Sequence, residues 1–264
     1  MRFPRPPLLV LLAALGTGLP LGTPPATSAE TGSSPGRRPD PDATALVRDI
    51  LSRVPDRRLL MTGVLKLRDA EGHRSEVPVR YTVAPEPGGW RGTYETKAAA
   101  GRVPERLVII RRQDEPTRYL HTVNAGPEGP GHEPAELVGE HAAIPFAGTD
   151  YWLSDLGLEF LHWPDQRMVR DARITMRQSR PCKVLDSFSP EPARTKYARV
   201  RSWLDAESGA PIYAEGFDEK GRRFKVFSLR GFTKVNGHWQ PKDLEMLNEF
   251  TDSRTRLELT LDSD

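Results

Sequence analysis

A series of short segments with alternating apolar and polar residues constrains the fold of this chain more than any other feature. In the last segment, Leu257, Leu259 and Leu261 alternate with polar residues, which is typical of a strand with one buried face. Hairpin turns separate such segments, as at Asn236-Gly237 and at residues 218–221, because Asn and Gly accept a positive φ. The pattern predicts a mainly β protein with antiparallel neighbours.

About ten strands in one meander favour an open antiparallel β-barrel or a strongly curved sheet, covered by two or more short helices. No internal repeat and no second domain are evident, so residues 43–264 are expected to form a single domain. The candidate strand segments are residues 59–68, 76–84, 90–96, 107–111, 117–123, 169–176, 183–188, 197–205, 211–218, 222–233, 242–250 and 254–261.

One helix is predicted before the first strand. Asp40 can cap its start, and Pro41 suits the first helical position. Apolar residues then follow at helical spacing until Pro55, which ends the pattern. This stripe consists of Leu46, Val47, Ile50, Leu51 and Val54.

The segment 149–163 interrupts the strands and is far more aromatic than the 8% average of the chain. A helix pressed into the mouth of a curved sheet would account for it, with Thr149 or Asp150 as its cap. Gly157 in its middle costs about 1 kcal/mol relative to Ala, which suits a lid that shifts. On this helix Leu153, Leu156, Phe160 and Trp163 line one face, and Asp155, Glu159 and His162 line the opposite face.

The first residues are typical of an export signal. Arg2 and Arg5 precede an apolar run at residues 8–15, and small residues at 27–29 precede a cleavage point near Ala29. Glycine and proline interrupt the run well short of the ~20 residues that a membrane span needs. Residues 1–29 are therefore predicted to be a cleaved signal peptide that exports the protein. Residues 30–42 are predicted to be a disordered leader.

Charge excludes one class of function. The chain has 38 basic and 36 acidic residues, and the two arginines of the signal account for the difference. A neutral mature chain argues against nucleic-acid binding, which needs a basic surface. The only cysteine, Cys182, can form no internal disulfide and is interpreted as a small buried apolar residue.

Sequence signatures of catalysis are absent. The chain has no Gly-x-Ser-x-Gly, His-Glu-x-x-His, Walker or Gly-x-Gly-x-x-Gly motif. His132 and His141 lie in a long loop, residues 124–145, that is either functional or poorly ordered, and a solvated loop is favoured over a metal site. A glycosidase pair from Asp150 and Glu159 is not selected by spacing. The arginine pairs at 111–112 and 222–223 are interpreted as solvated faces.

The distinctive residues that remain are apolar and aromatic. A curved sheet with a covering helix can enclose a cavity lined by such side chains, although a filled core is the alternative that the pattern alone favours. The candidate cavity and lid residues are Tyr151, Trp152, Leu153, Leu156, Phe160, Trp163, Trp203, Phe217, Phe227 and Met246. Trp239, on the strand after residue 236, belongs to the same aromatic set.

Several stretches follow one another in a distinctive order. The first is Gly148-Thr-Asp-Tyr-Trp-Leu-Ser-Asp-Leu156. The others are Cys182-Lys-Val-Leu-Asp186, Tyr197-Ala-Arg-Val-Arg-Ser-Trp-Leu-Asp205, Phe217-Asp-Glu-Lys-Gly-Arg-Arg-Phe-Lys225, Gly237-His-Trp-Gln-Pro241 and Thr255-x-Leu-x-Leu. In their order and spacing they resemble the outer-membrane lipoprotein-sorting proteins, the LolA/LolB-like family, over roughly residues 46–261.

The resemblance implies a monomeric periplasmic carrier with an open barrel covered by helices. Its apolar cavity would bind acyl chains of lipoproteins or other lipids and move them toward the outer membrane. An inner-membrane transporter and an outer-membrane acceptor would be its partners, with no cofactor, metal or enzymatic step. No single arginine here matches the cavity arginine of the carriers.

Two other functions stay open. A non-catalytic interaction or scaffold module of the envelope would use the same sheet with a filled core and an exposed apolar patch. A hydrolase or metal enzyme would need convergent polar residues in a pocket, which the sequence does not gather.

Overall fold

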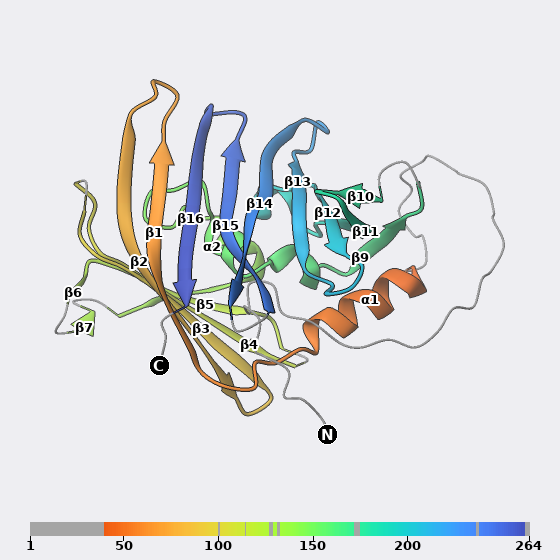
Figure 1. Ribbon diagram of the computed structural model, residues 1–264, viewed down its shortest axis with the longest axis horizontal. Coiled ribbons are helices and arrows are strands. Elements are labelled where there is room, and N and C mark those ends of the chain that lie inside the picture. Colours follow the sequence, from red (N-terminus) through yellow and green to blue (C-terminus); the bar gives the residue numbers. More distant parts are fainter. Residues whose placement is uncertain are drawn as a thin grey trace.

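The computed structural model describes residues 40–99, 101–113, 115–126, 129–130, 133–171, 175–235 and 238–261. Within these residues a 14-stranded antiparallel sheet curves around one long segment (Figure 1). No described helix is long and apolar enough to cross a membrane. The expected signal peptide lies outside the described residues, as does the leader up to residue 39. Residues 40–42, the end of the expected leader, are the start of a helix.

The strands follow one another in space as a meander. The order is β10 (Met176–Arg177), β11 (Arg180–Phe188), β12 (Arg199–Asp205), β13 (Pro211–Phe217), β14 (Arg223–Val235), β15 (His238–Asn248), β16 (Ser253–Leu261), β1 (Leu59–Arg68), β2 (Arg74–Glu86), β3 (Gly89–Thr96), β4 (Glu105–Arg112), β5 (Arg118–Val123) and β8 (Ala135–Val138), with β9 (Asp165–Val169) paired to β11.

The mainly β, curved and open architecture is as predicted, but the sheet has more strands than the ten or so expected. The long loop 124–145 contributes β8, which pairs with β5, and a small hairpin of β6 (Ala125–Gly126) and β7 (Gly129–Pro130). The expected strand 169–176 is wrong: β9 ends at Val169, and β10 begins only at Met176.

Pairing of the first strand, β1, with the last strand, β16, joins the N-terminal and C-terminal halves of the sheet. β1 lies between β16 and β2, so that Leu65 is paired with Leu257 on one side and with Val77 on the other. The period-two pattern of each strand then places all three side chains on one face, where each is 1% exposed. We call this the inner face, because the segment 139–163 packs against it.

The segment 139–163 covers the inner face in short turns rather than as the single helix that the sequence predicts. It contains η1 (Gly139–Ala142), α2 (Leu153–Leu156) and η2 (Glu159–His162). Leu158 has a φ of 51° and separates α2 from η2. Trp152 is the N-cap of α2 in place of Thr149 or Asp150, and its backbone N–H donates to Asp155 at 2.8 Å.

The helix α1 (Pro41–Leu51) begins as predicted. The Asp40 side chain caps it by accepting from the N–H groups of Asp42 and Ala43. Its buried side packs with Leu161 and with two strand residues, and α1 lies beside β9 at one end of the sheet (Figure 1). A third short helix, α3 (Pro192–Thr195), precedes β12.

The single cysteine is buried, as predicted. Cys182 lies on β11 with its side chain 6% exposed, and burial raises the pKa of its thiol.

Candidate functional site

A cavity of about 670 Å³ opens between α1 and the end of the sheet, which is within the range of small-ligand pockets. Four parts of the chain form its wall: α1, the turn between β2 and β3, the end of β4, and residues 161–166. We call it the α1 cavity. Its lining residues are Thr44, Val47, Arg48, Leu51, Ser52, Val54, Glu86, Gly88, Gly89, Trp90, Arg111, Arg112, Gln113, Glu115, Leu161, His162, Trp163, Pro164 and Gln166.

A buried arginine projects into this wall. Leu107, Ile109 and Arg111 alternate along β4 and share the inner face, so the Arg111 side chain is only 9% exposed. Its Nη2 donates to the Gly157 carbonyl oxygen at 2.5 Å, and its guanidinium carbon lies 5.2 Å from the centroid of the Trp90 ring. The expectation that Arg111 belongs to a solvated face is therefore wrong.

Glu159 lies next to this arginine in η2. The Tyr119 hydroxyl donates to Glu159 Oε2 at 2.8 Å in a buried contact. Burial raises the pKa of Glu159 to about 7, although Tyr119 and Arg111 act in the opposite direction. The sequence placed Glu159 on a polar helix face, but the side chain is 7% exposed.

His162 contributes a second polar group to the wall of the cavity. Burial, with a smaller effect of the Arg111 charge, lowers the pKa of His162 to about 3. The imidazole is therefore neutral at physiological pH. His162 Nε2 and Arg111 Nε are both buried, and neither has a hydrogen-bond partner among the described residues. A buried polar atom without a partner is costly.

A separate polar cluster holds α2 to the sheet. Lys225 of β14 is 2% exposed, and its Nζ lies 2.9 Å from Asp155 Oδ2. Tyr197 donates its hydroxyl to Asp155 Oδ1 at 2.7 Å. Lys225 Nζ is also 3.4 Å from the centroid of the Trp152 ring. The space beside this cluster is only about 40 Å³, so this part of the inner face is nearly filled.

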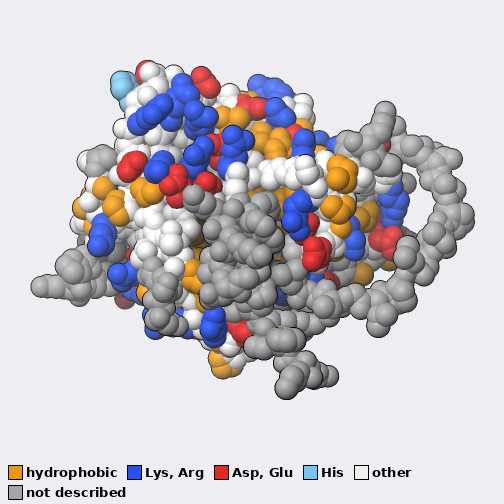
Figure 2. Space-filling model, in the orientation of Figure 1, with side chains coloured by type: hydrophobic (Ala, Val, Ile, Leu, Met, Phe, Trp, Pro, Cys, Tyr) orange, Lys and Arg blue, Asp and Glu red, His pale blue; other side chains and the backbone are white. Residues whose placement is uncertain are grey.

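The opposite surface of the sheet carries mixed charges. Figure 2 shows Lys and Arg side chains interleaved with Asp and Glu near the tips of β1, β2 and β16. Lys66 contacts Glu258 at 2.8 Å, and Arg256 contacts Glu245 at 3.4 Å. Such pairs leave no large field of one sign, in keeping with the neutral charge of the predicted mature chain.

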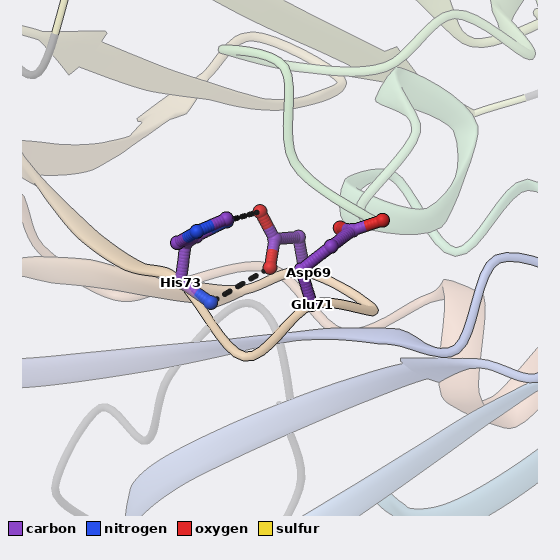
Figure 3. A group of neighbouring side chains, drawn as sticks. All are labelled: Asp69, Glu71 and His73. Atoms are coloured by element: carbon purple, nitrogen blue, oxygen red, sulfur yellow. Dashed lines mark hydrogen bonds and ion pairs between the residues drawn. The ribbon is translucent and has the colours of Figure 1, made fainter.

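Asp69, Glu71 and His73 form a group of potential metal ligands in the turn between β1 and β2 (Figure 3). All three are exposed. Asp69 accepts from the backbone N–H of His73 at 2.8 Å and lies 3.0 Å from its Nδ1. These bonds close the turn without an ion, so the group is explained by the local structure.

Three solved structures, each from a different bacterium, are among those with similar folds. An outer membrane lipoprotein-sorting protein domain from Vibrio parahaemolyticus aligns with a TM-score of 0.66 and 15% identity, covering 84% of this chain and 93% of its own. A LolA superfamily protein from Nitrosomonas europaea aligns with a TM-score of 0.57 and 14% identity, covering 83% and 91%. The chain has a LolA-like fold.

Two further comparisons bear on this fold. A DUF1329 family protein from Desulfovibrio piger aligns with a TM-score of 0.61 and 13% identity, covering 83% of this chain and 91% of its own. The sequence profile of a family described as "Uncharacterized protein" matches residues 132–261. No curated protein sequence matches this chain significantly. The resemblance noted in the sequence is confirmed at the level of the LolA-like fold.

Within the LolA-like fold, most residues expected to line a cavity are packed in the core. The main apolar cluster contains Tyr151, Leu153, Leu156 and Met246, and the partly buried Phe227 packs against it. Two of these, Phe227 and Met246, reach the small cavity beside Lys225, together with Phe160. Trp152 packs on Tyr197 and Phe224. Only Trp163 of the ten candidates lines the α1 cavity.

Phe217 and Trp203 also line neither cavity. Phe217 lies at a register shift between β13 and β14. The Arg199 guanidinium covers its ring at 4.1 Å. Trp203 packs edge-on against Tyr213 at 5.2 Å. Trp239 lies among strand residues whose side chains are outside the described set.

The sequence does not predict that the polar residues Arg111 and His162 line the α1 cavity. The acidic residues that follow Arg111 and Arg112 favour a solvated face, although the alternation of Leu107 and Ile109 extends to Arg111 and gives the correct face. His162 was assigned to a polar helix face that does not form, because α2 ends at Gly157. No local signal brings α1 beside β3 and β4.

Proposed function

We propose that this protein is a non-enzymatic carrier that binds acyl chains in the α1 cavity and moves them through the periplasm toward the outer membrane. The single observation that carries the proposal is the 670 Å³ cavity with a largely apolar wall of Val47, Leu51, Trp90 and Leu161. The LolA-like fold supports it. Partners at the inner and outer membranes, the predicted export signal and a monomeric state are parts of the same proposal.

Apolar burial supplies the driving force for such binding. Each methylene withdrawn from water contributes roughly 0.8 kcal/mol, so an acyl chain needs an enclosure to cross an aqueous compartment. The polar groups of the wall cover a minor part of it and can orient one end of a ligand. Tyr151, Leu153 and Leu156 support the wall from the core rather than contact the ligand.

Blocking the cavity tests the proposal. Leu51→Trp fills space at the wall of α1, whereas Ala45→Trp adds the same ring on the exposed side of the same helix. Delipidated protein would be titrated with a fluorescent fatty-acyl probe, and the freshly purified protein would be examined by native mass spectrometry. We expect wild type and Ala45→Trp to bind the probe and Leu51→Trp to lose at least tenfold in affinity, about 1.4 kcal/mol.

Failure to bind any acyl probe, with no co-purified lipid, would contradict the carrier function. Equal binding by Leu51→Trp would exclude the α1 cavity as the site. A stable protein partner recovered without lipid would instead favour the interaction module on the same fold.

A further inference from the structure

The α1 cavity contains a positive charge that no acidic side chain pairs with at close range. Among the described residues, Arg111 makes one hydrogen bond, to the Gly157 carbonyl, and one contact with the face of Trp90. No carboxylate of the described residues forms an ion pair with its guanidinium, and Glu159 attracts it only at longer range. A buried charge without a close partner is costly, so an anionic ligand at this position would be favoured.

The donor geometry of Arg111 suits an oxyanion. A guanidinium presents five N–H groups in a planar fork that matches a carboxylate or a phosphate. Nη2 is used by Gly157, whereas the buried Nε has no partner. The fork therefore has N–H groups that no described residue accepts, and the residue itself lines a cavity large enough for a ligand.

His162 adds a second unsatisfied atom to the same wall. Its Nε2 is buried without a partner, and the residue lines the α1 cavity with Arg111. A neutral imidazole nitrogen can donate to a ligand oxygen in one tautomer. Leu161 and Trp163, on either side of His162, supply apolar surface to the cavity. The wall thus offers polar groups for a head group and apolar surface for a chain.

The nearby carboxylate does not replace such a ligand. Glu159 accepts from the Tyr119 hydroxyl and attracts Arg111 at longer range without forming an ion pair with it. Glu86 and Glu115 also line the cavity, but their contacts are with Arg91 at 2.5 Å and Arg112 at 3.8 Å. Arg48 and Arg112 also line the cavity but are exposed, so Arg111 is its buried cation without a close ion pair among the described residues.

We propose that the α1 cavity selects an anionic single-chain amphiphile, whose oxyanion head group binds the Arg111 fork beside His162 while its chain lies along Val47, Leu51 and Trp163. This rests on the proposed function and adds the head group to it. The carboxylate of a fatty acid and the phosphate of a lysophospholipid offer the same chemistry, and the test separates them.

The test compares head groups at a constant chain. Delipidated wild-type protein is titrated with palmitate, palmitoyl lysophosphatidic acid and palmityl alcohol, each competing with a neutral fluorescent acyl probe. We expect at least one of the two anions to bind about tenfold or more tightly than the alcohol. The stronger anion identifies the head group.

Variants assign the preference to the arginine. Arg111→Met removes the charge and the donors but keeps much of the side-chain volume, and Arg111→Lys keeps the charge but loses the fork. Arg106→Gln is the matched control, because Arg106 lies on the same strand, is exposed and pairs with Glu95. We expect Arg111→Met to abolish the preference for the anion with little change for the alcohol, and Arg111→Lys to keep part of it.

The outcomes separate the two proposals. If neither anions nor alcohol bind, the carrier function fails. If wild type binds all three equally, or if Arg111→Met keeps the preference, the acyl site stands and the assignment of Arg111 is overturned. The comparison of ligands on wild type needs no variant, so it tests the anion preference even if Arg111→Met folds poorly, and Arg111→Lys then tests the assignment to Arg111.

Discussion

Lys225 Nζ lies 2.9 Å from Asp155 Oδ2 in a pair that is almost fully buried, with side-chain exposures of 2% and 10%. The pair joins β14 to α2, two elements far apart in sequence. Burial lowers the pKa of Lys225, and the attraction of Asp155 partly offsets that effect. The Lys225–Asp155 pair and the hydrogen bond that Asp150 accepts from Thr255 at 2.8 Å both fix the segment 139–163 to the sheet.

Removing the cation alone should destabilise the fold strongly. Lys225→Met leaves Asp155 buried without its counter-charge, and breaking a buried pair in this way costs about 3–5 kcal/mol. Lys225→Met combined with Asp155→Asn should cost less, because the amide can still accept from Tyr197. Urea unfolding of both variants, with the exposed Lys220→Met as control, measures the difference. Equal stability of wild type and Lys225→Met would contradict the structural role.

Glu159 should make the fold less stable as the pH rises. Its folded-state pKa of about 7 lies above the ordinary value of 4.5, so between these values the folded state binds more protons than the unfolded one. Stability therefore falls from about pH 4.5 to pH 7, by roughly 3 kcal/mol for this group. Glu159→Gln removes this dependence. The free energy of unfolding of Glu159→Gln, measured in urea, should exceed that of wild type by an amount that grows from pH 4.5 to pH 8. A difference between the two proteins that does not change with pH would refute the prediction.

His162 should have the opposite effect in the acid range. Its folded-state pKa of about 3 lies below the ordinary 6.5, so the unfolded state binds more protons between these values. Wild type should lose about 1.4 kcal/mol for each pH unit below 6.5 through this group. His162→Phe should lack this loss. The stability difference between the two proteins, measured at pH 7 and pH 4.5, gives the sign directly, and exposed His73→Phe provides the control.

The strands could be predicted from the sequence because their cause is local. β1 has the predicted bounds of 59–68, and Leu257 and Leu259 of β16 point to the buried face as their alternation indicates. Asp40 likewise caps α1 through bonds to residues two and three positions away. Period and capping are properties of a few neighbouring residues.

The site could not be predicted because its causes are long-range. α2 ends at Gly157 where Arg111 binds its carbonyl, and that arginine lies 46 positions earlier in the chain. The burial of Lys225 is set by Asp155, 70 positions away. The alternation of Lys225 with Phe227 and Leu229 indicates the inner face, but no local pattern identifies the carboxylate that pairs with it.

Gly157 provides a test that separates helix propensity from packing. On propensity alone, Gly157→Ala would stabilise a helix by about 1 kcal/mol. In the structure a Cβ at this position would overlap the Tyr119 hydroxyl and lie 2.7 Å from Tyr119 Cε1. We therefore expect Gly157→Ala to destabilise the protein by about 1–3 kcal/mol, as overpacking does.

A second substitution distinguishes this clash from any other effect of the alanine. Tyr119→Phe removes the hydroxyl and should recover part of the stability lost in Gly157→Ala, although the single variant Tyr119→Phe leaves Glu159 without its donor.

Ser154→Ala, in the same turn of α2, removes a buried hydroxyl without a partner and should be neutral or stabilising. A thermal unfolding midpoint of Gly157→Ala above that of wild type would show that the covering segment moves away from Tyr119, as a lid would.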